Sequence, residues 1–275
     1  MYTTFKKIII DSDAKNELDD QYAITYAVLS ESFDIRGFTA SHYGKNGSME
    51  KSHEEILHVL NLLGRSDNYP VLHGAVEALS DSKKPRDSDG AQFIIREALE
   101  TKDSLYVICI GPVTNLASAY LLEPAIQNKI KCIWLAGKAW PEGGLFFNNR
   151  NDIIAAKLIF SSGIDLTLIP SVGTANKLKV RIQDRLHIKG RGLIGDYLWH
   201  LFMRRLGISK AIYDVVSIAA LKIPHSCTWL TAPRPELRSD GTYNHNRTQG
   251  TITVITDINA ENIKKDFFTC LNRGS

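Results

Sequence analysis

Residues 6–30 have the sequence KKIIIDSDAKNELDDQYAITYAVLS, and this stretch decides the class of fold. The apolar run at Lys6–Ile10 predicts a buried strand, because a strand covered on both faces is almost continuously apolar. Between Asp19 and Ser30, apolar residues recur on one face, which predicts a helix. A buried strand followed by a helix, with a polar turn between them, is typical of the βαβ units of a parallel sheet.

The same alternation continues through most of the chain. Further strands are predicted at 35–40, 69–73, 105–110, 132–136, 166–170 and 251–257, and further helices at 49–63, 91–99, 153–160, 261–271 and up to residue 122. This order predicts an α/β fold with an open, mostly parallel, mixed sheet and helices on both faces. Residues 180–209 interrupt the order and predict a helical insertion or lid within a single domain spanning 1–275.

The composition is that of an ordinary globular protein. Hydrophobic residues make up 44% of the 275 residues, charged residues 23%, and the net charge is +3. We take the basic residues as scattered, unlike the clustered excess of nucleic-acid binders. No apolar run approaches the roughly 18–20 residues of a spanning helix, and the N-terminus lacks the apolar stretch of a signal peptide. We therefore expect a cytoplasmic protein with neither a membrane nor nucleic acid as partner.

Five acidic residues follow the first predicted strand within ten positions: Asp11, Asp13, Glu17, Asp19 and Asp20. Like charges at this density repel, and burial strengthens the repulsion. A fold keeps such acids ionised by supplying a cation or several hydrogen-bond donors. Because carboxylate oxygens favour Ca²⁺ or Mg²⁺ over Zn²⁺, the pattern predicts a divalent metal site. The alternative is an exposed acidic turn that caps the following helix.

A second alternative starts from the same acids. A strand followed by D-x-D also begins a class of phosphatases, and on that hypothesis the chain is a Mg²⁺-dependent phosphohydrolase with Asp11 as nucleophile. The cysteines give no competing metal site, because none of the four lies at C-x-x-C spacing. We expect them to be buried thiols in a reducing compartment; they are Cys109, Cys132, Cys227 and Cys270.

Several segments, in order, resemble the inosine–uridine-preferring nucleoside hydrolase family. The family opens with a strand, D-x-D, a short turn and D-D; the matching residues here are Asp11, Asp13, Asp19 and Asp20, with a turn that is two residues longer. The sequence GPVTN at 111–115 is similar to the family's G-P-L-T-N, and FNNRND at 147–152 to its F-N-x-x-x-D. The resemblance implies a Rossmann-like nucleoside hydrolase fold and a hydrolase that cleaves the N-glycosidic bond of a ribonucleoside or a modified nucleoside.

The resemblance also implies a calcium site and a sugar site. The metal ligands would be Asp13, Asp20, Asp214 and the backbone carbonyl of Ile110, with Mg²⁺ a weaker candidate. Asp13 would activate a Ca²⁺-bound water as general base, and Asp11 would orient its neighbours from behind. The substrate-binding residues would be Asp19, Asn46 and Asn148. Trp140, which follows a predicted strand, would stack on the base or pack under the sheet.

Two positions depart from the family pattern. Phe146 stands where the family has a glutamate that binds the ribose 5′-hydroxyl, which implies a 5′-deoxy, 5′-modified or otherwise different sugar, or simple core packing. Tyr213 stands where the family has histidine, and a phenol is the poorer proton donor near pH 7. Tyr213 is thus the candidate catalytic acid, and protonation of the leaving group stays open.

These departures leave a further alternative for the function. A chain that kept the fold and the cation site but lost catalysis would be a ribose- or nucleoside-binding protein. The resemblance implies a homo-oligomer, a dimer or a tetramer, with a small-molecule nucleoside as its partner.

Overall fold

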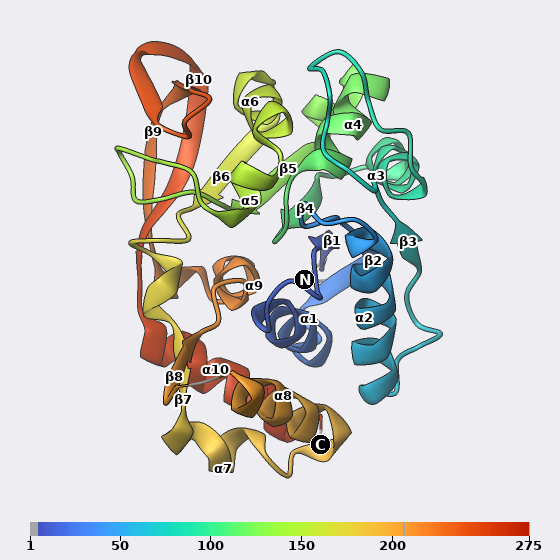
Figure 1. The fold of residues 1–275 in the computed structure, drawn as a ribbon, viewed down its shortest axis with the longest axis vertical. Coiled ribbons are helices and arrows are strands. Elements are labelled where there is room, and N and C mark those ends of the chain that lie inside the picture. Colours follow the sequence, from blue (N-terminus) through green and yellow to red (C-terminus); the bar gives the residue numbers. More distant parts are fainter. Residues whose placement is uncertain (1–4, 206, 275) are drawn as a thin grey trace.

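The computed structural model describes residues 5–205 and 207–274, which form an eight-stranded sheet in the order β3-β2-β1-β4-β5-β6-β10-β9 (Figure 1). Its strands are β1 (Lys6–Ser12), β2 (Phe33–Ala40), β3 (Val71–His73), β4 (Leu105–Cys109), β5 (Ile130–Leu135), β6 (Asp165–Ile169), β9 (Cys227–Leu237) and β10 (Tyr243–Ile258). All neighbours are parallel except β9 and β10, which form an antiparallel hairpin. A separate ladder joins β7 (Lys179–Arg181) to β8 (Ser209–Ala211).

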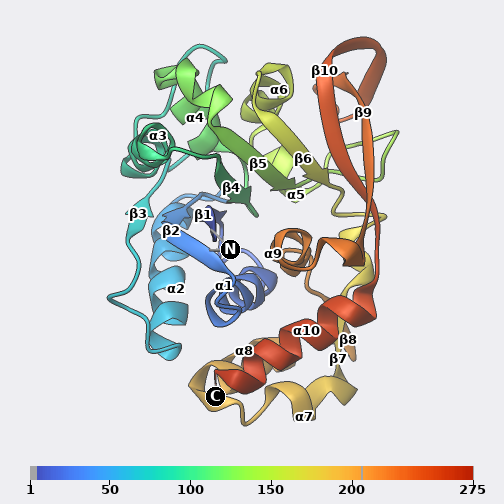
Figure 2. The same ribbon diagram turned by 180° about the vertical axis from the view of Figure 1, so that it is seen from behind.

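Helices cover both faces of the large sheet, which confirms the predicted α/β class. Figures 1 and 2 show α3, α4 and α6 on one face, and α1, α2 and α9 on the other, backed by α8 and α10. The helices are α1 (Asp19–Leu29), α2 (Ser48–Leu62), α3 (Asp89–Glu100), α4 (Thr114–Leu122), α5 (Phe147–Asn151), α6 (Ile153–Ser161), α7 (Arg185–Ile188), α8 (Gly192–Arg204), α9 (Val215–Lys222) and α10 (Ala260–Arg273).

Strand β1 shows why the first strand is apolar without interruption. Ile8 and Ile10 belong to the core on the α1 and α9 side, whereas Ile9 belongs to the core beneath α3 and α4. All three side chains are fully buried. Each contributes about 1.5–3 kcal/mol through burial, so β1 is anchored in two cores at once and its C-terminal end is held firmly in place.

The strand order places a ligand site at the end of β1. The chain runs from β1 outward through β2 to β3, and then returns to add β4 on the other side of β1. In open parallel sheets, ligands bind beyond the carboxyl ends of the strands at such a reversal. The acidic residues 11–20 start at this point.

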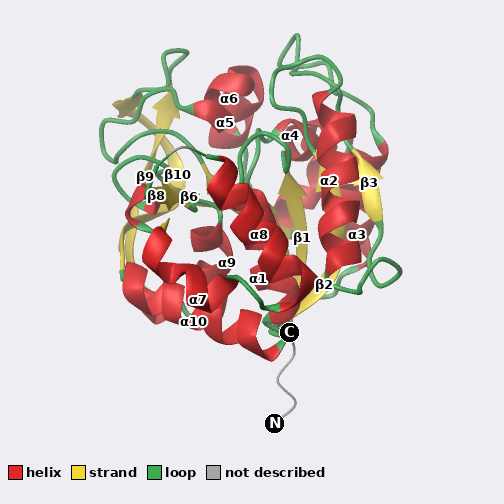
Figure 3. Cartoon of the chain, turned by 60° about the horizontal axis from the view of Figure 1, so that its bottom comes forward, coloured by secondary structure: helices red, strands yellow, loops and turns green. Residues whose placement is uncertain are grey.

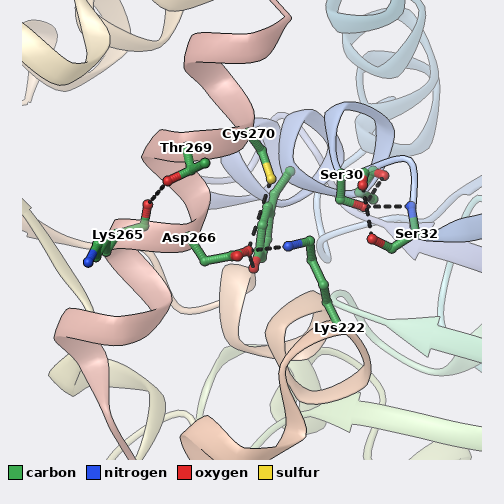
Figure 4. Close-up of polar contacts among 9 residues, drawn as sticks. Ser30, Ser32, Lys222, Lys265, Asp266, Thr269 and Cys270 are labelled. Atoms are coloured by element: carbon green, nitrogen blue, oxygen red, sulfur yellow. Dashed lines mark hydrogen bonds and ion pairs between the residues drawn. The ribbon is translucent and has the colours of Figure 1, made fainter.

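A polar cluster joins the C-terminal halves of α1 and α9 to the middle of α10. Lys222 at the end of α9 donates to the carboxylate of Asp266 in α10 at 2.5 Å, as Figure 4 shows. The hydroxyl of Tyr26 in α1 donates to the same oxygen. Since the opposite ends of α1 and α9 carry Asp20 and Asp214, this cluster fixes one helix relative to the other far from the acidic residues.

Residues 180–209 contain the four-residue helix α7, the longer helix α8 (Figure 3) and half of the residues of the β7–β8 ladder. The action of this segment as a lid, and the single-domain organisation, stay predictions. Strand β9 was not predicted, because Pro233 and Pro235 argue against a strand. The structure places β9 at the edge of the sheet, where a strand tolerates the missing N–H groups.

Candidate active site

A cavity of about 190 Å³ opens beyond the carboxyl ends of β1, β4, β5 and β6. The N-terminal ends of α1 and α5 and the residue preceding α9 complete its wall. Its lining residues are Asp13, Asn16, Glu17, Asp19, Asp20, Ile110, Leu135, Phe146, Phe147, Asn148, Ser171, Lys210, Ala211, Tyr213 and Asp214. A larger hollow of about 1060 Å³ lies between α6 and the β9–β10 hairpin, but among the described residues that line it Glu236 is the only acid. The chemistry is therefore concentrated in the smaller cavity.

Three buried carboxylates meet in this cavity. Asp19, Asp20 and Asp214 each offer an oxygen, and these oxygens lie within 4.8 Å of one another. Asp19 and Asp20 form the first turn of α1, and Asp214 directly precedes α9. The side chain of Asp214 makes no capping hydrogen bond to its own helix, so helix capping does not explain this aspartate.

The electrostatics of the cluster call for a cation. Burial raises the pKa of Asp13, and the charges of Asp20 and Asp19 raise it further. Burial and the Asp19 charge raise the pKa of Asp20 to about 8, and the pKa of Asp214 is raised by burial and by the other three acids. Four such groups ionise together only beside a positive charge. Closely spaced carboxylate oxygens are ligands of hard divalent ions, so the residues present fit a Ca²⁺ or Mg²⁺ ion.

Neighbouring polar side chains orient these acids. The hydroxyl of Ser12 donates to Asp20 at 2.6 Å, and the amide of Asn16 donates to Asp13 at 3.1 Å. Neither donor was predicted. Ser12 stands between the two aspartates of D-x-D, and its role follows only from the approach of α1 to the end of β1.

Asp11 lies behind the cavity and does not line it. It is fully buried, and its Oδ1 accepts hydrogen bonds from Thr39 at 2.6 Å and from Asn115 at 2.7 Å. Burial, partly offset by these bonds, raises its pKa to about 6. A carboxylate enclosed in this way cannot attack a substrate, which disfavours the phosphohydrolase alternative.

Glu55 of α2 anchors the turn that carries the acids. It is buried and accepts hydrogen bonds from Gln21 at 2.9 Å and Tyr197 at 2.5 Å, and it pairs with Lys15. Burial alone would raise the pKa of Glu55, but these three donors hold it below its usual range. Lys15 lies in the turn that is longer than in the family, so Glu55 connects this turn to α1 and α8.

Removing the Glu55 carboxylate is expected to destabilise the protein. Glu55→Ala leaves three donors without their acceptor, and we expect a loss of about 2–4 kcal/mol in the free energy of unfolding, measured by urea denaturation. Glu54→Ala is the matched control, because Glu54 is exposed on the same helix and its change stays within about 0.5 kcal/mol. Equal effects of the two substitutions would contradict the anchoring role.

One wall of the cavity is aromatic. The ring of Phe146 lies 4.8 Å from that of Phe147 and 6.2 Å from that of Tyr213, between centroids. Burial and the nearby acids raise the pKa of Tyr213 above its usual value, so this phenol keeps its proton at neutral pH. Among the described residues lining the cavity, none is a histidine.

The predicted metal ligand Ile110 and the predicted substrate-binding residue Asn148 contact each other. The side-chain amide of Asn148 donates to the carbonyl of Ile110 at 2.8 Å and to that of Leu135 at 2.9 Å. Asn148 thus joins the ends of β4 and β5 while lining the cavity. The Ile110 carbonyl keeps its second lone pair for another partner.

Two predicted substrate-binding residues lie away from the described lining of this cavity. Asn46 is exposed in the loop between β2 and α2. Trp140 packs against the core beneath α3 and α4, and the centroid of its ring lies 5.2 Å from that of Tyr243 and 5.1 Å from that of His245. The structure therefore does not bring them together with the acidic cluster, and their contact with a substrate stays a prediction.

An ion-pair group borders the cavity. Glu17 pairs with Lys210 and with Arg205, each at 3.3 Å. Lys210 partly offsets the acids, since its charge lowers the pKa of Asp19 against the larger effect of burial. These two basic side chains thus offset the acids of the cavity only in part.

Comparisons with known proteins agree with this geometry. The sequence model of the inosine-uridine preferring nucleoside hydrolase family matches residues 8–265 of this chain. A probable uridine nucleosidase 2 of Arabidopsis thaliana is 27% identical over 70% of this chain and 67% of its own length. The pyrimidine-specific ribonucleoside hydrolase RihA of Escherichia coli O81 (strain ED1a) is 25% identical over 67% of this chain and 66% of its own length. The match thus covers about two thirds of the length of each of these two relatives.

Solved structures share the fold over nearly the whole chain. A plant nucleoside hydrolase, the PpNRh1 enzyme, superimposes with a TM-score of 0.82 at 20% identity, covering 98% of this chain and 99% of the other. A purine-preferring ribonucleoside hydrolase from Gardnerella vaginalis superimposes with a TM-score of 0.80 at 20% identity and the same coverage. With the family match spanning most of the residues, the chain belongs to the inosine-uridine preferring nucleoside hydrolase family and is a nucleoside hydrolase.

Proposed function

We propose that this chain hydrolyses the N-glycosidic bond of a ribonucleoside with the help of a Ca²⁺ ion held by Asp13, Asp20, Asp214 and the Ile110 carbonyl. The observation that carries the proposal is the meeting of the α1 and α9 carboxylates within 4.8 Å in a buried cavity. Asp19 belongs to this tight group, so it is either a further ligand or, as the resemblance implies, a partner of a ribose hydroxyl.

The residues suit cleavage through an oxocarbenium-like state. When bound, the cation supplies Lewis acidity that polarises a water and holds the sugar hydroxyls. Asp13 takes the proton of the attacking water, because its carboxylate lines the cavity next to the proposed metal position and can accept that proton. The anionic wall stabilises positive charge developing at the anomeric carbon. Asp11 holds the end of β1, and with it Asp13, through Thr39 and Asn115.

Departure of the base involves Tyr213 in this proposal. Its phenol keeps a proton at neutral pH and lines the cavity beside Phe146. It can donate a hydrogen bond to a departing base, whereas full proton transfer is harder than from an imidazole. We infer that the best substrates carry a base that leaves with little protonation.

Base release from a panel of purine and pyrimidine ribonucleosides tests the proposed function. The purified protein with Ca²⁺ is expected to liberate free base from at least one member, detected by chromatography. Binding of nucleosides by calorimetry without any turnover would instead favour the ribose-binding alternative.

Phe146 directs the choice of sugar. It is half-buried in the cavity wall beside Phe147 and Tyr213, at the position where the resemblance implies a ligand of the 5′-hydroxyl. An apolar ring there cannot pair with a hydroxyl, and leaving that hydroxyl unpaired costs binding energy. We propose that the chain prefers ribonucleosides whose 5′ position is deoxy or carries an apolar group.

Phe146→Glu is expected to reverse this preference. The new carboxylate pairs with a 5′-hydroxyl, so the ratio of kcat/KM for a nucleoside to that for its 5′-deoxy analogue rises by about 10–100-fold. Phe146→Leu serves as the apolar control and leaves the ratio nearly unchanged. A ratio that stays constant in Phe146→Glu would show that the ring packs without touching the sugar.

The location and the oligomeric state of the enzyme are further parts of the proposal. We propose that the enzyme is a cytoplasmic homo-oligomer, a dimer or tetramer, as the resemblance implies. None of the described helices has the length and apolarity to cross a bilayer.

A further inference from the structure

The basic residues concentrate in one segment, contrary to the scattered distribution expected from the sequence. Residues 177–210 contain nine Lys or Arg and two Asp, a net charge of +7, whereas the whole chain carries +3. Of these nine, Lys177, Arg205 and Lys210 are in ion pairs. No ion pair is found, within the described part of the chain, for the other six, which are Lys179, Arg181, Arg185, Lys189, Arg191 and Arg204.

Large apolar side chains are exposed in the same segment. Among the described residues, five of the thirteen exposed large hydrophobic side chains lie between positions 182 and 208. Leu186 is 75% exposed, Leu193 71% and Ile208 78%. Exposed apolar groups gathered in this way mark an interaction site.

These side chains belong to neighbouring elements at one end of the molecule. The β7–β8 ladder, α7 and α8 lie together along the lower edge in Figures 1 and 2, with α7 outermost. The ladder pairs Arg181 with Ser209, and the amide of Ile182 donates to the carbonyl of Ile208. A side chain of the α7–α8 connection, Arg191, donates to the carbonyl of Leu186. We call the six unpaired cations together with Ile182, Leu186, Leu193 and Ile208 the basic edge.

We propose that the basic edge is a docking surface for a bilayer that contains anionic lipids. Each Lys or Arg near such a surface is attracted to the lipid phosphates and carboxylates. The exposed leucine and isoleucine side chains of the basic edge then enter the boundary between headgroups and acyl chains. The protein would lie on the membrane surface and not span it.

The mixture of charge and apolar surface selects the bilayer over other occupants. A nucleic acid or an acidic polypeptide would neutralise the cations but leave three strongly exposed aliphatic side chains in water. A second copy packed through the same edge would bring like charges together.

Vesicle sedimentation tests the proposal with the whole 275-residue chain. It is expected to bind phosphatidylcholine vesicles that contain about 30 mol% phosphatidylserine, and not pure phosphatidylcholine vesicles, at low salt. The double variant Arg185→Glu/Lys189→Glu should lower the partition coefficient by at least about 20-fold. Leu186→Ser/Leu193→Ser should lower it by about tenfold and increase its sensitivity to salt. The melting temperature of both variants should stay unchanged because all four residues are exposed, and base release should stay unchanged because none of them lines the cavity.

Lys83→Glu/Lys84→Glu is the matched control, since these lysines are an exposed pair outside the basic edge. Retained vesicle binding in this control supports the proposal. Equal losses in the control and in Arg185→Glu/Lys189→Glu would overturn it, because binding would then follow overall charge. Absence of binding to anionic vesicles overturns it as well. Tighter binding to single-stranded DNA than to vesicles, unaffected by the leucine substitutions, would identify a polyanion site instead.

Discussion

Asp13→Asn is expected to lower kcat for base release by about 10²–10⁴-fold, the usual contribution of a general base. Asparagine keeps the shape of the side chain, and the turn that binds Asp13 through Asn16 has no reason to rearrange. The same substitution removes one proposed ligand, so the dissociation constant for Ca²⁺, measured by calorimetry, should rise. The variant and the native chain are assayed with the same saturating nucleoside, so the effect is the ratio of their two kcat values.

Asp67→Asn provides the control for Asp13→Asn, because Asp67 is exposed on a loop outside the cavity. Its kcat and Ca²⁺ affinity should equal those of the native chain. A decrease of less than about tenfold in Asp13→Asn, with saturating Ca²⁺, would show that another group takes the proton. A rise in the Ca²⁺ dissociation constant with unchanged kcat would leave Asp13 as a ligand only.

Removing divalent ions with a chelator is expected to abolish base release, by about 10³-fold or more, and to change the pH dependence of stability. Without the cation, the pKa of Asp20 in the folded chain is about 8 against an ordinary value of 3.8, and those of Asp13 and Asp214 are also raised. Between pH 3.8 and about pH 8 the folded state therefore binds more protons than the unfolded state, so the stability of the metal-free protein falls as pH rises.

Adding Ca²⁺ should therefore raise the melting temperature more at pH 8 than at pH 5. At a hundredfold excess over its dissociation constant the ion adds about 2.7 kcal/mol, or roughly 5–10 °C. At pH 5 protons compete for the carboxylates and the increase shrinks. Calorimetric scans with Ca²⁺ and with Mg²⁺ also compare the two ions. An equal increase at both pH values would place the binding site outside this group of acids.

The fold was predictable because its signals are local. A buried strand such as β1 is apolar throughout, and a helix such as α1 has an apolar face, so their alternation identifies a parallel α/β sheet. The structure confirms that class and, through the family match, the resemblance. Strand β9 escaped prediction because its pairing partner and its edge position, which make Pro233 and Pro235 acceptable, are properties of the sheet and not of the segment.

The candidate site was predictable only in part, for a similar reason. The acids after β1 are recognisable in the sequence because five of them lie within ten residues. The structure brings two of them, Asp19 and Asp20, together with Asp214. The surroundings come from distant elements: Glu55 reaches the acidic turn from α2, and Tyr197 reaches Glu55 from α8. No pattern within α2 distinguishes a glutamate that anchors a turn from one that faces solvent. Such partners become visible only when the helices are packed.

The placement of Asp214 has a consequence for biosynthesis. Asp20 leaves the ribosome early, whereas its partner in the cluster and the Asp266 contact that steadies α1 and α9 come from the last third of the chain. Until then a nascent polypeptide lacks the third carboxylate of this cluster, although β2 and β4, the strands that pair with β1, are already synthesised. Pairings between such remote segments form slowly. An ion that needs the carboxylates of both α1 and Asp214 would therefore bind only after residue 214 has been synthesised.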